Sequence, residues 1–271
     1  MADAKRGSLS LGGSRMVRRQ VGSTGFTVAP IALGTTKFGR NTDVKYPASF
    51  ALPSAQQIAE LFESALKLGV HLIDTAPAYG ESEQRLGALV DMHRDEILLC
   101  SKCGENYANG RSSHDFSAVA IIASVEASLS RLKTDHIDIL LLHSDGRDVE
   151  ILTQTDALEG LGKLKQSGKV GAMGISAKTP AGIREAARSC DIVMAPFSQK
   201  ETVLADALAA AHDQGVGVLA IKGLFSGHLE ARPAIEFVLN QPFIDALVIG
   251  TLNPAHLELA VEIAENMPNR G

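Results

Sequence analysis

The chain has 271 residues, 45% hydrophobic and 21% charged, with a formal net charge of -5. This length suits one large α/β domain, because eight βα units need roughly 250 residues. The sequence has neither a basic block typical of nucleic-acid binding nor an apolar run near the ~20 residues of a membrane span, so we expect a cytoplasmic protein without nucleic-acid or membrane partners, as a monomer or weak homo-oligomer.

The first 15 residues are rich in Ser, Gly, Lys and Arg and have no hydrophobic periodicity. This composition predicts a flexible N-terminal tail or a leader. Residues 16–271 are predicted to form one domain. It opens with a β-hairpin, in which strands at 18–21 and 26–28 flank a turn at 22–25 that contains Gly22 and Gly25.

Short apolar strands then alternate with amphipathic helices. The helix predicted at 54–68 begins with a capping box formed by Ser54 and Gln57 and ends at Gly69. Further helices are predicted at 117–132, 179–188, 203–214 and 254–266. The predicted strands lie at 29–33, 71–74, 97–101, 137–143, 172–176, 192–196, 216–221 and 246–250.

Eightfold alternation of strand and helix predicts a parallel sheet, and the chain length favours a closed (β/α)₈ TIM barrel of the α/β class. A doubly wound open sheet is the alternative. It would place a glycine-rich G-x-G-x-x-G turn after the first strand, and the sequence has none there. The long polar segment at 40–53 is predicted to lie over the mouth of the barrel.

Four chemically active side chains fall at or just after the carboxyl ends of three consecutive predicted strands. Asp74, Lys102 and His143 each follow an apolar run, and Tyr79 lies five positions after Asp74. Because the carboxyl ends of barrel strands form one face of the fold, we expect these side chains to converge at its mouth.

These four residue types suit the reduction of a carbonyl group, which needs a proton donor at the developing alkoxide. The ordinary pKa of tyrosine is about 10, and a neighbouring lysine lowers it. A carboxylate keeps that lysine charged, and a neutral histidine orients the substrate oxygen. Each residue alone also fits a structural role, as an ion pair, a core histidine or a packing tyrosine. Their joint placement favours catalysis.

Cys100 and Cys103 form a C-x-x-C spacing around Lys102. A redox pair is one interpretation, and packing is the other. Side chains alternate along a strand, so Cys100 shares the face of Lys102 and Cys103 takes the opposite face. Neighbours on opposite faces are poorly placed for a disulfide, and we expect both thiols to stay reduced.

The chain resembles the aldo-keto reductase superfamily, in particular its short bacterial members. The resemblance is carried by the runs 72–87, 129–143, 168–176 and 248–257 and by the pair Ser101-Lys102. It implies NADP(H)-dependent reduction of aldehydes or ketones to alcohols by hydride transfer from nicotinamide C4. Tyr79 would be the proton donor, and Lys102 and Asp74 would be the pair that adjusts its pKa. His143 would orient a small carbonyl substrate.

The resemblance also implies a cofactor site for NADPH, with NADH as the alternative. Several positions depart from the family pattern, namely Ala177, Met194, Ile221, Gly250, His256 and the pair Leu259-Ala260. These departures lower the affinity that the family pattern predicts for the nicotinamide and the 2′-phosphate. Lys222 is a candidate for the positive charge that the family usually places at the phosphate. The positions that match cofactor-binding sites are Gly34, Thr35, Thr36, Asp74, Ser176, Leu224, Ser226, Gly250, Thr251 and His256.

A second functional hypothesis follows from these departures. The chain could be a nucleotide-binding barrel that acts as a redox sensor or regulatory protein with little turnover. A barrel lyase or isomerase would need a phosphate or metal site. The sequence has no His, Cys, Asp or Glu cluster with metal-ligand spacing, so we expect no metal.

Overall fold

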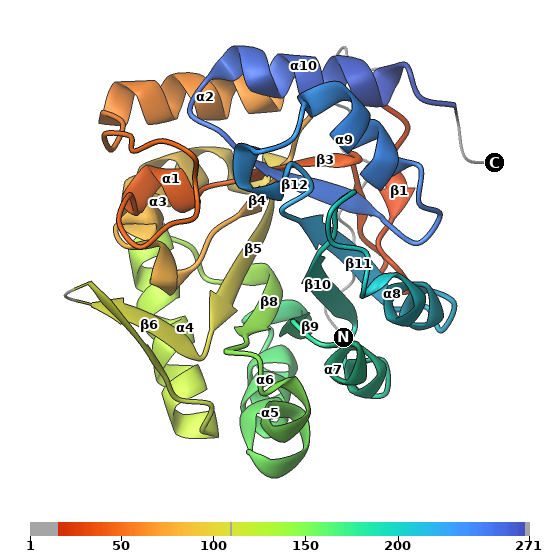
Figure 1. Ribbon diagram of the computed structural model, residues 1–271. Helices are drawn as coiled ribbons and strands as arrows, with labels where there is room; N and C mark the ends of the chain where they lie inside the picture. The colour runs from red at the N-terminus through yellow and green to blue at the C-terminus, as the bar shows by residue number, and fades with distance from the viewer. Residues whose placement is uncertain (1–15, 109, 269–271) are drawn as a thin grey trace.

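The computed structural model describes residues 16–108 and 110–268 and shows a closed barrel of eight parallel strands in chain order (Figure 1). The residues 1–15, predicted as a tail, lie outside this range. The barrel is closed because its last strand pairs with its first: Leu247 lies opposite Ile31, and Gly250 lies opposite Gly34. The strands are β3 (Ile31–Gly34), β4 (Leu72–Asp74), β5 (Leu98–Cys103), β8 (Ile137–His143), β9 (Val170–Ser176), β10 (Ile192–Pro196), β11 (Gly217–Ile221) and β12 (Ala246–Gly250).

The barrel confirms the predicted fold class and excludes the open sheet, and each predicted strand end agrees with the structure to within two residues. In β5 the difference matters for the site, because Lys102 and Cys103 lie within the strand rather than after it.

Helices cover the outside of the barrel, and α2 and α10 lie side by side there (Figure 1). The capping box of Ser54 and Gln57 forms as predicted. Within the described residues, no helix is long and apolar enough to cross a membrane. The helices are α1 (Thr36–Gly39), α2 (Ala55–Lys67), α3 (Ser82–His93), α4 (Ala118–Leu132), α5 (Asp148–Gln154), α6 (Ala157–Gln166), α7 (Pro180–Ala186), α8 (Ala205–His212), α9 (Ala231–Leu239) and α10 (Pro254–Glu265), with short 3₁₀ turns η1 (Pro77–Tyr79), η2 (Arg94–Glu96) and η3 (Phe225–Gly227).

The predicted N-terminal hairpin is present, with strands β1 (Arg19–Gln20) and β2 (Thr27–Val28). Val21 and Val28 pack with residues of the barrel interior, so the hairpin closes the end of the barrel opposite the mouth. Gly22 has a φ of +47°, and its Cα faces the backbone of Gly217 at the start of β11. A side chain at position 22 would collide with that strand, which explains the glycine.

The barrel wall separates two apolar clusters, and the two cysteines of the C-x-x-C spacing lie in different clusters. Cys100 packs inside the barrel with Leu72 and Ile139. Cys103 belongs to the larger cluster between strands and helices. The two side chains therefore take opposite faces of β5, as strand alternation predicts, and both cysteines are free and buried. This placement favours packing over a redox pair.

A second hairpin, absent from the predicted elements, follows β5. Its strands β6 (Glu105–Ala108) and β7 (Arg111–His114) project from the barrel (Figure 1). Gly104, with a φ of +90°, lies beneath the ring of Phe116 and turns the chain into the hairpin. Both strands are polar and largely exposed, so hydrophobic periodicity could not reveal them.

His71, at the closed end of the barrel just before β4, makes folding sensitive to acid. Its side chain is buried, and neither ring nitrogen has a hydrogen bond of good geometry to the described residues, although the Glu96 backbone lies nearby. Burial, with repulsion from Arg18, lowers the pKa of His71 below 6.5. The unfolded chain therefore binds more protons than the folded protein as the pH falls below about 6.5, and the free energy of unfolding falls with it.

We expect the melting temperature to drop between pH 7.5 and pH 5 in calorimetry. The His71→Leu variant should drop less over the same range and should be at least as stable as the native chain at pH 7.5, because it removes a buried polar ring. Parallel pH profiles for the two proteins would show that His71 does not contribute to acid sensitivity.

Candidate active site

The structure brings the four sequence-predicted residues together at the carboxyl ends of three neighbouring strands. Asp74 ends β4, Lys102 is the penultimate residue of β5, and His143 ends β8. Tyr79 ends η1, the short turn that follows β4. The rings of Tyr79 and His143 meet edge to face, with centroids 6.1 Å apart. All four groups therefore share one small volume at the mouth.

Lys102 and Asp74 form a buried ion pair. The Nζ atom of Lys102 lies 2.5 Å from Oδ1 of Asp74 and also donates to the carbonyl of Thr75 at 2.9 Å. Only 1% of the lysine side chain and 4% of the aspartate side chain are exposed. Burial alone would lower the pKa of Lys102, but attraction to Asp74 outweighs it and raises that pKa above its ordinary value. Lys102 is therefore a fixed positive charge.

Tyr79 stands beside this pair. Its hydroxyl lies 3.5 Å from Oδ2 of Asp74, and Nζ of Lys102 lies 4.8 Å from the ring centroid. Burial, followed by the Asp74 charge, raises the pKa of Tyr79 to about 12, against the opposing effects of Lys102 and Thr36. The neighbouring lysine alone predicts a lowered pKa. In this structure burial outweighs the lysine, so Tyr79 is a protonated phenol at neutral pH.

His143 has a carboxylate partner that the sequence analysis missed. Its Nδ1 atom lies 2.8 Å from Oε2 of Glu105, the first residue of β6. The other carboxylate oxygen of Glu105 accepts a hydrogen bond of 2.6 Å from Ser112 on β7. The sequence signal for this hairpin is the Asn-Gly pair at 109–110, a common two-residue turn between strands.

A buried acidic residue outside the barrel holds β5 in place. Glu83, in the first turn of α3, accepts hydrogen bonds from Ser101 of β5 and from Ser128 and Arg131 of α4. Ser101 precedes Lys102 and points to the opposite face of the strand. Because all of its partners are bonded, this network fixes the strand that carries Lys102.

The positions that match cofactor contacts fall into two groups, and the first lies close to the catalytic candidates. Ser176 ends β9 beside His143, is 5% exposed, and its hydroxyl makes no hydrogen bond with any described residue. Thr36 lies near Tyr79. The hydroxyl of Thr35, in contrast, is buried and bonded to the Asp74 carbonyl and to Ser82. Ser176 is thus the side chain whose hydroxyl is open to a carboxamide group.

The second group lies around the N-terminus of α10 and the loop after β11. Thr251 bonds to His256 at 3.3 Å, and His256 is exposed on the first turn of α10. Gly34 and Gly250 are paired at the ends of β3 and β12. Lys222 and the partly buried Leu224 and Ser226 belong to the loop after β11, in which Lys222 and Ser226 have positive φ. A helix N-terminus next to paired glycines fits the phosphates of a dinucleotide.

The segment 40–53, predicted to lie over the mouth of the barrel, passes over this second group. The Tyr46 hydroxyl lies 3.6 Å from where a Cβ of Gly250 would stand, and Pro47 approaches Gly227 in the same way at 3.5 Å. Lys37 lies 4.1 Å above the Tyr46 ring. The other end of the segment rests on the second hairpin through stacking of Arg40 on Tyr107 at 3.6 Å. The segment therefore spans the mouth.

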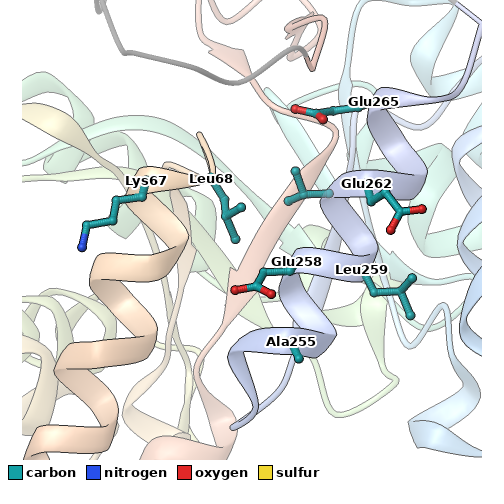
Figure 2. A pocket seen from close by; sticks show the side chains of 8 residues that line it. Lys67, Leu68, Ala255, Glu258, Leu259, Glu262 and Glu265 are labelled. Atoms are coloured by element: carbon teal, nitrogen blue, oxygen red, sulfur yellow. The ribbon is translucent and has the colours of Figure 1, made fainter.

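A separate groove of about 440 Å³ lies on the outer surface between α2 and α10 (Figure 2). Glu258, Glu262 and Glu265 line its α10 side, and Lys67 and Leu68 line the other. None of the four candidate residues lines it. Within the described part of the chain, no group of three His, Cys, Asp or Glu residues could hold a metal ion. The chemistry therefore belongs to the mouth of the barrel.

Comparison with known proteins identifies relatives of this chain. The model of the aldo/keto reductase family matches residues 30–237. A solved structure from Pseudomonas aeruginosa, assigned provisionally to the aldo-keto reductases, is 40% identical, with a TM-score of 0.86 over 96% of this chain and 98% of that one. D-threo-aldose 1-dehydrogenase from a Pseudomonas species is 30% identical over 75% of this chain and 82% of its own length. The NADH-specific methylglyoxal reductase of Escherichia coli is 28% identical, covering 82% of this chain and 72% of the relative.

Proposed function

This chain belongs to the aldo/keto reductase family of oxidoreductases, whose members use nicotinamide cofactors on small carbonyl substrates, and we propose that it reduces aldehydes or ketones to alcohols with NADPH. The observation that carries the proposal is the buried Lys102–Asp74 pair beside the Tyr79 hydroxyl. A protonated phenol held against a fixed positive charge is suited to give its proton to an alkoxide.

Each residue at the mouth has a separate role in the proposed reaction. When bound, the reduced nicotinamide supplies a hydride to the carbonyl carbon. Tyr79 donates its proton to the carbonyl oxygen as negative charge develops there. Lys102 stabilises the phenolate that remains, and Asp74 holds Lys102 in position. His143 orients the oxygen toward Tyr79. The 2.5 Å ion pair and the burial of both partners mean that these charges need little reorganisation during the reaction.

The residues present fit a nicotinamide dinucleotide. The unpartnered hydroxyl of Ser176 would hold the carboxamide beside His143, and the N-terminus of α10 with Thr251 would receive the phosphate groups. The three cysteines are buried free thiols, which suits a reducing compartment and supports our proposal of a cytoplasmic location.

The preference for NADPH over NADH should be modest. The 2′-phosphate would meet His256 rather than an arginine, and an arginine would offer a two-pronged hydrogen bond. We therefore expect the His256→Arg substitution to tighten NADPH binding about tenfold or more and to leave NADH binding nearly unchanged. Fluorescence titration of both cofactors against both proteins checks this. An equal gain for NADH would place the new arginine away from the 2′-phosphate.

Steady-state NADPH oxidation with a panel of small aldehydes tests the proposed function. The second candidate, a nucleotide-binding sensor with little turnover, is favoured by one observation, that Met194 and Ile221 stand where the family holds and stacks the nicotinamide. We expect saturable, aldehyde-dependent oxidation. Tight NADPH binding without turnover on any aldehyde would favour the sensor instead.

A further inference from the structure

Glu105 makes the second ionic contact of the site, and it comes from outside the barrel. Its Oε2 atom lies 2.8 Å from Nδ1 of His143, and only 13% of its side chain is exposed. The β6–β7 hairpin carries it to this place, and the hydrogen bond from Ser112 across the hairpin fixes the carboxylate. Gly104 makes the turn that directs the hairpin over the end of β8.

A carboxylate at this distance has a definite effect on an imidazole. A neutral histidine has one ring nitrogen with a proton and one without, and the hydrogen bond at one nitrogen decides which. The carboxylate of Glu105 can only accept, so Nδ1 of His143 must hold the proton. Nδ1 is also buried. Nε2 is therefore the nitrogen left for a substrate oxygen, and it can donate to that oxygen only when the ring carries a second proton.

The surroundings of His143 act in both directions on that second proton. Burial, together with the nearby Lys102, outweighs Glu105 and Asp74 and lowers the pKa of His143 below its ordinary value. Tyr79 packs against the ring edge to face, and His114 on β7 lies near Glu105. Interaction with His143 and Ser112 outweighs burial and lowers the pKa of Glu105 to about 2, so this residue stays negative.

We propose that Glu105 is a positioning residue that holds a proton on Nδ1 of His143 and stabilises the doubly protonated ring, in which Nε2 donates to the substrate oxygen. The inference rests on the proposed function for its catalytic meaning, but the tautomer is a property of the protein alone. The proposal gives the β6–β7 hairpin a role, because Glu105 is the only carboxylate of the described residues within ion-pair distance of His143.

The test compares the native chain with Glu105→Gln, which keeps the side-chain size and removes the charge. The control is Asp115→Asn, which removes a charge of the same sign at the end of the hairpin, where Asp115 is exposed and contacts Ser117 rather than His143. The first readout is ¹⁵N NMR of His143, assigned by its loss in a His143→Gln variant. The second is the pH profile of kcat/KM with a small aldehyde.

We expect Nδ1 to carry the proton in the native chain and the control. In Glu105→Gln the pKa of His143 should fall by about one unit or more, because an opposite charge is lost. Because Nε2 donates only from the doubly protonated ring, activity falls as the pH rises through the pKa of His143, and this limb of the kcat/KM profile should move to lower pH by the same amount. At neutral pH, kcat should fall about tenfold or more with the smaller fraction of doubly protonated ring. Identical NMR titrations in Glu105→Gln and the native chain would overturn the inference. Absence of turnover in the native chain would overturn the proposed function instead, while the NMR result would still decide the tautomer.

Discussion

Replacing Tyr79 by Phe should reduce aldehyde reduction by about 10² to 10⁴, the usual contribution of a general acid. The substitution removes one hydroxyl and keeps the ring that packs against His143. The hydroxyl is the group 3.5 Å from Asp74 that would otherwise protonate the product. Steady-state rates with NADPH at saturating aldehyde measure the effect, and the loss should appear in kcat.

The variant should still bind cofactor, because Tyr79 contributes no charge to it at neutral pH. NADPH affinity measured by fluorescence is therefore the internal control, and Tyr107→Phe is the matched variant, since the Tyr107 hydroxyl contacts Thr42 rather than Asp74 or Lys102. It should keep most of its activity. Native turnover in Tyr79→Phe would remove Tyr79 from the mechanism.

The Lys102→Met substitution should have the largest effect on stability, at about 3–5 kcal/mol, and should also abolish most turnover. It leaves the Asp74 carboxylate buried without its counter-charge. It also removes the charge that stabilises the Tyr79 phenolate. Denaturant unfolding measures the stability, and Lys67→Met, which changes an exposed lysine of α2, should change it by no more than about 0.5 kcal/mol.

The double variant with Asp74→Asn and Lys102→Met separates the charge from the packing. Neutralising both partners should recover much of the lost stability, because the uncompensated charge is gone, while activity should stay low. If the Lys102→Met variant unfolds at the same midpoint denaturant concentration as the native chain, the ion pair is not the buried contact that the structure describes.

The barrel itself could be predicted because its signals are local. Apolar strands such as Ile137–His143 and Ile192–Pro196 are bounded by turns, and the Ser54 capping box marks the start of α2. Strand order then follows from chain order, since parallel strands with short helical crossovers pair with their neighbours. The convergence of Asp74, Lys102 and His143 followed from the same rule, because all three occupy strand ends.

The features that escaped prediction depend on contacts between distant residues. The β6–β7 hairpin has no apolar periodicity, so Glu105 could not be assigned to His143 from spacing alone. The direction of the Tyr79 pKa also depends on burial, which the sequence does not give; the neighbouring lysine alone suggested a lower value. The hydroxyl of Thr35 matched a cofactor position, yet it is bonded to Ser82 and to the Asp74 backbone.

Transfer of deuterium from C4 of labelled NADPH to the product alcohol is the most direct test of the account. The native chain is incubated with a small aldehyde and NADPH deuterated at C4, separately in each of its two stereochemical positions, and the alcohol is analysed by mass spectrometry. Direct hydride transfer from nicotinamide C4 should place one deuterium on the former carbonyl carbon from one of the two labelled cofactors and none from the other. An alcohol without deuterium from either cofactor, or no alcohol from protein that binds NADPH, would contradict it.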